Sequence, residues 1–220
     1  MTPTSSARSP DTGDALIRAA LRLFGEQGYD ATSTREIAAA AGANVASISY
    51  HFGGKEGLRA ACGDFIIGRM GSVMAAAFDI GDPGAPSGLT PQEASLRLVQ
   101  ICERMTQALN GEEGRLLAPF MLREITSPSS LIDTIYEGMI GPVHQRLCRL
   151  WADATGAPHD APETLLRVFS LVGQIVYFAL ARRIVLKRMG WDDFGASEAA
   201  TLTSVLRANV EAIIADATVR

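Results

Sequence analysis

The sequence has 220 residues, 47% of them hydrophobic, and a formal net charge of −4. This composition excludes an intrinsically disordered protein, and the length allows one or two helical domains with buried cores. The longest uncharged apolar window, residues 168–181, has 14 residues, fewer than the ~20 that a membrane-spanning helix requires. Residues 1–10 lack the apolar core of a secretory signal. We therefore expect a soluble cytoplasmic protein, without membrane contact, that begins with a flexible tail.

The first helix is predicted over residues 12–27, because apolar side chains recur there at helical spacing. Leu16, Leu21 and Phe24 belong to this face, and Gly28 follows as a stop signal. We expect this helix to pack over the two short helices that come next.

Two short helices joined by a tight turn are predicted between Ser33 and Phe52. Ser33 and Glu36 have the spacing of a capping box, in which the serine oxygen accepts from one backbone amide and the carboxylate accepts from the other. Gly42 provides a left-handed residue that ends the first of these helices, and Asn44 caps the second. Such a helix-turn-helix has the shape that fits the major groove of DNA.

The second short helix carries hydroxyl, phenol and imidazole groups on its outward face, at Ser47, Ser49, Tyr50 and His51. Groups of this kind can reach base edges and phosphate oxygens at once. The alternative is an ordinary helical hairpin with a polar, solvated face.

A fourth helix is predicted from Gly54 to Phe78, and it links the two halves of the chain. Lys55 lies in its first turn, where a cation opposes the helix dipole and adds no stability. A phosphate contact would explain this lysine, and a merely solvated side chain is the alternative.

The charge of the N-terminal part argues against a strong bulk attraction to DNA. Residues 1–60 contain six basic and six acidic side chains, so their net charge is zero. Binding would then depend on locally placed charges, on helix N-termini aimed at phosphates, and on two copies of the domain acting together. A dimer is therefore a mechanistic requirement of this hypothesis.

Glycine and proline residues mark a loop over residues 81–91, which separates the DNA-binding part from the rest. Thr90, Pro91 and Glu93 then begin a helix by a capping box with proline at the first position, and this helix ends at Asn110.

Further helices are predicted at about 112–126, 128–155, 162–188 and 196–216, and no segment alternates as a strand does. Pro119 and Pro142 fall inside these helices, so kinks or breaks are expected there. Bent helices leave gaps, and a gap lined by methionine and aromatic side chains would suit a small apolar or aromatic ligand. The predicted lining is Met105, Phe120, Met121, Tyr136, Met139, Trp151 and Phe178, together with Arg123, which could instead pair on the surface. Plain core packing is the alternative.

The segment 168–181 is apolar on nearly every side. One protein core cannot easily cover all sides of a helix, so a second covering surface is implied. The last helix carries a matching apolar stripe. We therefore expect a homodimer interface formed by Phe169, Val172, Val176, Leu202, Leu206, Val210 and Ile213. The alternative is a helix buried inside a single chain.

The sequence offers little enzyme chemistry. It has no serine elbow, no phosphate-binding glycine loop and no histidine–glutamate metal spacing, so we expect no catalytic site, no metal and no cofactor. Cys62, Cys102 and Cys148 are far apart and are expected to be buried, with a redox sensor as the alternative. An all-α small-molecule-binding or adapter protein without DNA binding, and an α-helical enzyme, remain as competing functions.

Two regions resemble a known family. The residues Thr34-Arg35-Glu36-Ile37-Ala38, Gly42, Asn44, Ser47-Ile48, Tyr50-His51-Phe52 and Lys55-Glu56-Gly57-Leu58 resemble the DNA-binding domain of TetR-family transcriptional regulators. The residues Met121-Leu122-Arg123-Glu124-Ile125 followed by Pro128, and Leu171-Val172-Gly173-Gln174 leading to Gly190-Trp191, resemble a CecR-type C-terminal domain. Together these likenesses span most of the chain. Ser49 stands where the family has its second tyrosine of the recognition helix.

The resemblance implies an all-α protein, with an N-terminal three-helix helix-turn-helix domain and a larger helical domain for ligand binding and dimerisation. We expect the helix-turn-helix domain at residues 11–57, a connecting helix at 58–80, and the second domain at 92–220. The expected DNA contacts are Ser33, Thr34, Arg35, Asn44, Ser47, Ser49, Tyr50, His51 and Lys55. The expected function is that of a ligand-responsive repressor, which binds double-stranded palindromic operator DNA as a homodimer and is released by a small apolar or aromatic effector. In proteins of this kind the last two long helices form a four-helix bundle with their two-fold mates.

Overall fold

The structure, a computed structural model, describes residues 12–78, 88–127 and 129–218. The predicted tail and most of the predicted loop at 81–91 lie outside these residues. The described parts are helical throughout, apart from their connections, and contain no strand. The all-α prediction is confirmed.

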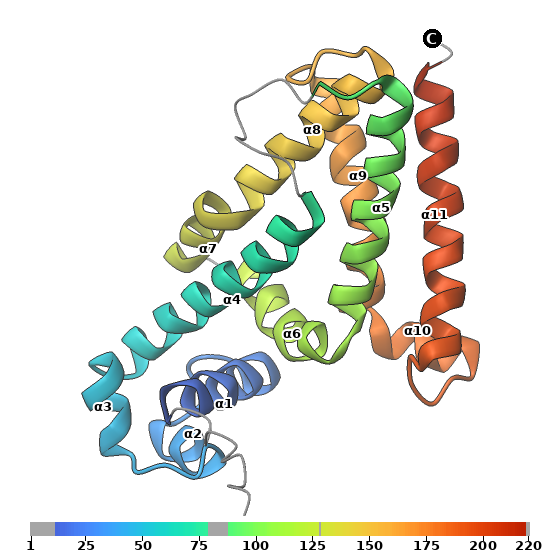
Figure 1. The fold of residues 1–220 in the computed structure, drawn as a ribbon. Helices are drawn as coiled ribbons and strands as arrows, with labels where there is room; N and C mark the ends of the chain where they lie inside the picture. Colours follow the sequence, from blue (N-terminus) through green and yellow to red (C-terminus); the bar gives the residue numbers. More distant parts are fainter. Residues whose placement is uncertain (1–11, 79–87, 128, 219–220) are drawn as a thin grey trace, which may run out of the picture.

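The N-terminal helices form a small three-helix unit at one end of the molecule (Figure 1). They are α1 (Thr12–Gln27), α2 (Thr34–Ala40) and α3 (Ala46–Phe52), and the first has the bounds predicted from its periodicity. Leu21 of α1, Ile37 of α2 and Ile48 of α3 are all buried in one cluster. The apolar spacing in the sequence therefore brings the three helices onto a shared core.

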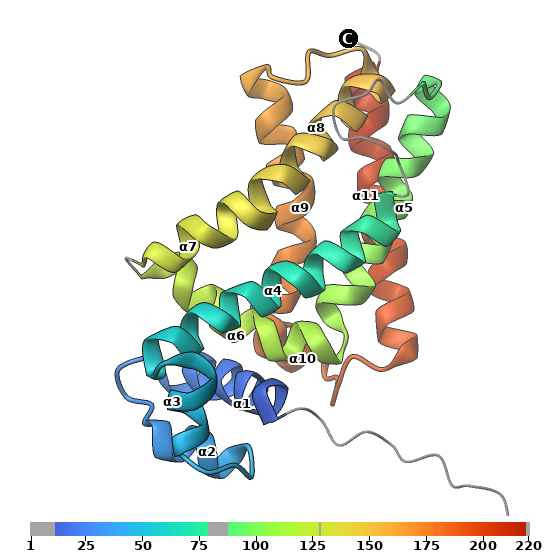
Figure 2. The ribbon, with the colours of Figure 1, turned by 60° about the vertical axis from the view of Figure 1, so that its left-hand side comes forward.

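A long helix, α4 (Lys55–Phe78), leaves this unit and runs diagonally along the C-terminal part, as two views show (Figures 1 and 2). The next helices are α5 (Pro91–Asn110) and α6 (Glu112–Thr126). The capping box predicted at the start of α5 is present, with the Glu93 amide donating to Thr90 Oγ1 and the Thr90 amide donating to the Glu93 carboxylate.

The two interior prolines behave differently. The sequence predicts a kink or a break at Pro119, but helix α6 continues through this residue without a break. The segment predicted at 128–155 consists of α7 (Ser130–Ile135), a π-helical turn η1 (Tyr136–Ile140) and α8 (Gly141–Thr155). The wide turn lies directly before Pro142, and the Gly141 amide donates to the Tyr136 carbonyl, five residues back. Because proline lacks an amide hydrogen and its ring crowds the preceding turn, the wider turn relieves the conflict.

The prediction of a single helix over residues 162–188 is wrong. The segment forms two helices, α9 (Pro162–Leu180) and α10 (Arg182–Met189), which are separated at Ala181, and α11 (Ala196–Thr218) follows. The change of direction places the Arg182 guanidinium against the Asp193 carboxylate and over the Phe194 ring. These partners lie beyond the helix in the sequence, so no local signal marks the break.

By length and composition alone, α9 could also cross a membrane, although only 22% of its most apolar window is buried within this chain. The prediction that no segment is long enough counted uncharged residues only. A helix whose exposed side is covered by a second protein surface has the same length and composition as one that crosses a membrane.

The N-terminal three-helix unit shares its core with the C-terminal part. One buried cluster joins Leu16 and Phe24 of α1 to Leu117 and Phe120 of α6 and to Ile135 of α7. A second cluster fills the C-terminal part around Trp151, with residues of α5, α8, α9 and α11. Because α1 and α6 share the first of these cores, a movement of α6 directly changes the packing of α1.

Helices α1 and α6 pack closely at the buried Gly25. A Cβ atom there would lie 2.9 Å from the Phe120 backbone nitrogen and 3.0 Å from the Pro119 Cβ. We expect Gly25→Val to lower the free energy of unfolding by about 1–3 kcal/mol, because overpacking forces the helices apart. Gly68→Ala in α4, where nothing lies within 4 Å, is the control and should raise it by about 0.5–1 kcal/mol. Denaturant unfolding measures both, and equal midpoints for wild type and Gly25→Val would contradict the close packing.

Candidate nucleic-acid interface and ligand pocket

Local hydrogen bonds fix the turn between α2 and α3. The Glu36 amide donates to Ser33 Oγ at 3.2 Å, and the Ser33 amide donates to the Glu36 carboxylate at 2.7 Å. The hydrogen bonds from Ser33 lower the pKa of Glu36 from its ordinary value. Gly42 adopts φ +63°, as its place after α2 predicts. The Asn44 side chain accepts from the amide of Ala46, the first residue of α3, at 2.9 Å, whereas Val45 directly before the helix provides no side-chain cap.

The outward face of α3 is polar and open to solvent. Ile48 is 1% exposed and faces the core, whereas Tyr50 is 85% exposed, and its ring meets the His51 ring edge to face. Ser49 and His51 are exposed, and Ser47 is half-buried. Because the tyrosine ring is almost fully exposed, it makes few apolar contacts within the chain. The position therefore suits contact with an external partner.

The remaining predicted DNA contacts are all at least partly exposed. Ser33, Arg35 and Asn44 are exposed, and Thr34 is half-buried in the first turn of α2. Lys55 is half-buried, and its Nζ lies 4.3 Å from the centroid of the Tyr29 ring. The structure thus gives this lysine a partner that the sequence reasoning missed, a cation–π contact with a residue just after α1.

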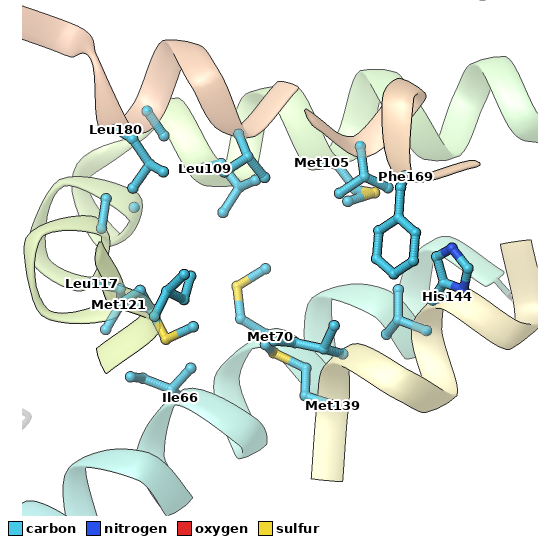
Figure 3. Close-up of a pocket in the computed structure, with 18 of the residues that line it drawn as sticks. Ile66, Met70, Met105, Leu109, Leu117, Met121, Met139, His144, Phe169 and Leu180 are labelled. Atoms are coloured by element: carbon cyan, nitrogen blue, oxygen red, sulfur yellow. The ribbon is translucent and has the colours of Figure 1, made fainter. Parts of the chain in front are cut away.

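A cavity of about 220 Å³ lies in the C-terminal part, enclosed by α4, α5, α6, η1, α8 and α9 (Figure 3). Methionines reach it from four different elements: Met70, Met105, Met121 and Met139. Among the described residues that line it, only His144 has a polar side chain. A pocket with this lining offers dispersion and burial of apolar area, and almost no hydrogen bonding.

The sequence predicted part of this lining. Met105, Met121 and Met139 line the cavity, but five predicted residues do not. Phe120 and Trp151 are each 1% exposed and fill the two cores, and Phe178 packs against the second core. Tyr136 is 55% exposed, and Arg123 is hydrogen-bonded to α1.

Several lining residues were not predicted, among them Ile66, Met70, Leu117 and His144. The His144 ring stacks on Phe169 with 3.8 Å between ring centroids. Its Nε2 lies 3.1 Å from the Leu165 carbonyl oxygen, so this nitrogen carries the hydrogen. The spacing of His144 and Phe169 along the sequence carries no signal for this stacking, which depends on how α8 and α9 pack.

Some of the predicted dimer residues face the interior of the chain instead of its surface. Leu202, Leu206 and Val210 are buried within the chain, and Ile213 is partly buried against the same core. Phe169, Val172 and Val176 line the cavity. Phe169 is also 49% exposed, and further solvent-facing residues include Leu166, Gly173 and Tyr177 of α9 and Val205, Ala208 and Ala212 of α11. Asn209 Nδ2 donates to Gln174 Oε1 at 3.0 Å, which ties the two helices together beside this surface.

One of the three cysteines lies beside the cavity, since Cys148 Sγ is 3.6 Å from Nδ1 of the lining His144. All three are buried, and burial raises the pKa of the Cys62 thiol strongly, that of Cys102 to about 12 and that of Cys148 to about 11. A raised pKa disfavours the reactive thiolate, which argues against the redox alternative. Within the described residues, no group of three or more His, Cys, Asp or Glu side chains could hold a metal ion.

Comparison with known protein families identifies the class. Residues 16–62 match the family described as bacterial regulatory proteins of the tetR family, and residues 94–217 match the C-terminal domain of the HTH-type transcriptional dual regulator CecR. The chain belongs to the TetR family of transcriptional regulators and has a CecR-type C-terminal domain. It is thus a DNA-binding regulator with a ligand-binding domain, as the residues of its two halves predicted.

Individual relatives agree with this assignment. The chain is 32% identical to the HTH-type transcriptional dual regulator CecR of Shigella flexneri over 216 residues, which cover 96% of this chain and 95% of the relative. It is 32% identical to the HTH-type transcriptional regulatory protein RaaS of Mycobacterium tuberculosis over 76% of this chain and 70% of that protein. Both relatives are described as HTH-type transcriptional regulators.

Solved structures show the same fold. AibR, crystallised with isovaleryl coenzyme A and operator DNA, superposes with a TM-score of 0.67 at 17% identity, over 90% of this chain and 97% of that one. PfmR, a TetR-family regulator from Thermus thermophilus, gives a TM-score of 0.64 at 19% identity, over 94% and 97% of the two chains. At such identities the likeness concerns the fold alone.

Proposed function

We propose that this protein is a repressor that binds a palindromic operator as a homodimer and is released by a small apolar or aromatic molecule. The observation that carries the proposal is that α4 and α6 line the apolar cavity and also pack against the DNA-binding unit. The fold is compatible with both kinds of partner, since AibR, which shares it, was crystallised with isovaleryl coenzyme A and operator DNA. We place the protein in the cytoplasm, where its DNA is, and assign it no catalysis.

We propose the domain division that the sequence predicts. In it, the helix-turn-helix domain comprises residues 11–57, the connecting helix residues 58–80, and the ligand-binding and dimerisation domain residues 92–220. In a homodimer, two-fold symmetry of the protein requires a site of two-fold symmetry, with half-site centres about one helical turn (~34–36 Å) or a multiple apart. Capture and sequencing of bound genomic fragments tests this proposal, and equal affinity for one half-site and for the full palindrome contradicts it.

The α3 face can be tested by separating positioning from sequence reading. We expect Tyr50→Ala and Lys55→Ala to weaken operator binding, and Ser47→Ala to change sequence preference more than bulk affinity. A phosphate contact by Lys55 predicts a salt slope lower by roughly one per protomer. Gel-shift titrations over a series of salt concentrations measure these effects.

The control for this experiment is Arg149→Ala, which removes an exposed cation from α8 in the C-terminal domain. Its affinity and salt slope should match those of the wild type. If the three α3-side variants also bind with full strength and unchanged preference, the DNA surface lies elsewhere.

The exposed side of α9 supports the dimer. Leu166 is 69% exposed, Tyr177 is 54% exposed and Val205 on α11 is 52% exposed, so apolar side chains from both helices meet solvent in one chain. Burying them against a second copy would remove this apolar area from water at about 25 cal/mol per Å². The same burial accounts for the apolar character of α9 without a membrane.

A further inference from the structure

Helix α6 is tied to the end of α1 by a single arginine. Arg123 Nε donates to the Gly25 carbonyl at 2.7 Å, and its Nη2 donates to the Glu26 carbonyl at 2.9 Å. The last carbonyls of a helix lack partners within the helix, and the last turn of α1 has no basic residue of its own. The guanidinium therefore supplies both the hydrogen bonds and the positive charge that this helix end favours.

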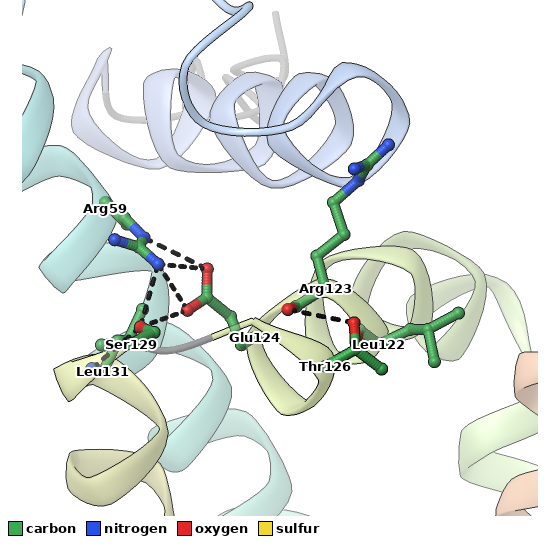
Figure 4. A network of polar contacts seen from close by, with 7 residues as sticks. All are labelled: Arg59, Leu122, Arg123, Glu124, Thr126, Ser129 and Leu131. Atoms are coloured by element: carbon green, nitrogen blue, oxygen red, sulfur yellow. Dashed lines mark hydrogen bonds and ion pairs between the residues drawn. The ribbon is translucent and has the colours of Figure 1, made fainter.

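The next residue ties α6 to the start of α4 (Figure 4). The side chain of Glu124 is 5% exposed, and its carboxylate accepts from Arg59 Nε at 3.1 Å and from Arg59 Nη2 at 2.9 and 2.7 Å. Ser129 Oγ donates to the same carboxylate at 2.7 Å and accepts from Arg59 at 2.9 Å. A buried carboxylate with this many charge-assisted partners has a fixed position.

The second tie reaches the DNA-binding face. The Arg59 guanidinium lies 4.8 Å from the centroid of the Tyr29 ring, the ring that also holds Lys55. Tyr29 in turn contacts Phe24 of α1, with 5.4 Å between ring centroids. Glu124 is thus connected through Arg59 and Tyr29 to Lys55, one of the residues predicted to meet phosphate.

The pocket occupies the same turn of α6. Met121 and Ile125, which flank Arg123 and Glu124 in the sequence, line the cavity. One helical turn therefore presents apolar side chains to the pocket and charged side chains to α1 and α4. Apolar packing tolerates sliding, whereas forked hydrogen bonds to two carbonyls and a buried ion pair are directional.

We propose that Arg123 and Glu124 are positioning residues that hold the DNA-binding unit in one orientation relative to the pocket-lining turn of α6. The inference rests on the proposed dimeric, ligand-released function, since it names the contacts through which α6 sets the separation of the two recognition helices. A dimer whose helices are held at one separation meets both half-sites without an ordering cost. Loss of either tie lets the unit rotate, so that only a fraction of dimers match the operator.

The test measures geometry and affinity in the full-length dimer. Spin labels at Asp30→Cys, exposed just after α1, report the distance between the two DNA-binding units, while the three native cysteines are buried. We expect one narrow distance distribution for the wild type and broadened distributions for Arg123→Ala and Glu124→Gln. If the competent fraction falls to about a tenth, the Kd for operator rises about tenfold.

A matched control exists on the same helices. Glu113, in the first turn of α6, pairs with Arg69 of α4 at 2.7 Å and with Arg18 of α1 at 3.7 Å, but these side chains are 31–52% exposed. Exposed pairs contribute little, so Glu113→Gln should keep both the narrow distribution and the wild-type Kd. Arg123→Lys retains the charge without the fork and should fall between wild type and Arg123→Ala, and it carries the test if the alanine variant does not fold.

The outcomes separate this inference from the proposed function. A wild type that binds no genomic fragment refutes the proposed function. The distance distributions do not require DNA, so they still show whether Arg123 and Glu124 fix the orientation of the N-terminal unit. Narrow distributions and a Kd within twofold of wild type in the Arg123 and Glu124 variants overturn the positioning role. Broadened distributions with an unchanged Kd overturn it as well, because the orientation would then not matter for DNA.

Discussion

Val205→Arg is expected to convert the homodimer into monomers and to abolish operator binding at concentrations where the wild type binds fully. Val205 is 52% exposed on the outer side of α11, next to the exposed Ala208 and Ala212. In a two-fold interface each substitution appears twice, so two unpaired charges are buried at a cost of several kcal/mol. Every 1.4 kcal/mol is a factor of ten in the dissociation constant.

The measurement is sedimentation of both proteins at micromolar concentration, followed by operator titration. Tyr136→Arg is the matched control, because Tyr136 is 55% exposed on η1, which packs against α4, α7 and α8. It should remain a dimer and bind DNA normally. A wild type that sediments as a monomer, or a Val205→Arg variant that remains a dimer, contradicts the proposed interface.

The choice of Val205 rests on burial within the chain, which periodicity alone does not reveal. Periodicity finds the most apolar stripe of a helix, which in α11 contains Leu202, Leu206 and Val210. A helix that packs on its own core presents that stripe inward, so the stripe identifies the core of the chain. The opposite side carries smaller residues, such as Ala208 and Ala212, whose pattern alone does not distinguish a symmetric interface from a solvated face. An arginine at Val176 would have entered the cavity instead.

Local signals served the N-terminal unit much better. Several predicted features of this unit depend on residues within four positions of one another. They are the bounds of α1, the capping box at Ser33, the positive φ of Gly42 and the hydrogen bond of Asn44 at the start of α3. Interactions at this short range involve residues that are neighbours in the sequence, so local sequence patterns predict them. The outward direction of Tyr50 followed from the inward direction of Ile48 two residues earlier.

The pocket depends on contacts that local spacing does not contain. Phe120 and Met121 are neighbours in α6, yet the first fills the core shared with α1 and the second lines the cavity. The sequence shows that both are apolar, but the rotation of α6 is set by Gly25 and Arg123, whose partners are almost a hundred residues apart. Long-range packing therefore decides which apolar residues meet a ligand.

A neutral apolar compound should bind the cavity, and a charged analogue of the same size should not. An engineered cavity of ~150 Å³ lined by leucine, isoleucine and phenylalanine binds benzene, so a cavity of about 220 Å³ suits a somewhat larger single or fused ring. A carboxylate or ammonium group would lose its hydration and find almost no partner in this lining. Thermal-shift screening of neutral and charged pairs, such as naphthalene derivatives, tests the distinction. Val176→Phe is the control, because it fills part of the cavity and should remove the shift.

The compound found in this way should oppose operator binding by a large factor. A ligand shifts the equilibrium only by its difference in affinity for the two arrangements, and a ~100-fold preference supplies about 2.7 kcal/mol per site. Two pockets in one dimer give up to ~10⁴-fold, about 5.5 kcal/mol, which is enough to move a bound population from nearly full to nearly empty. Because coupling is reciprocal, saturating operator DNA must weaken ligand binding by the same total factor. Calorimetric titration of the dimer with and without operator measures that factor directly. Equal ligand affinity in the two titrations would show that the compound occupies the pocket without acting as an inducer, because a ligand that does not distinguish the arrangements cannot release the DNA.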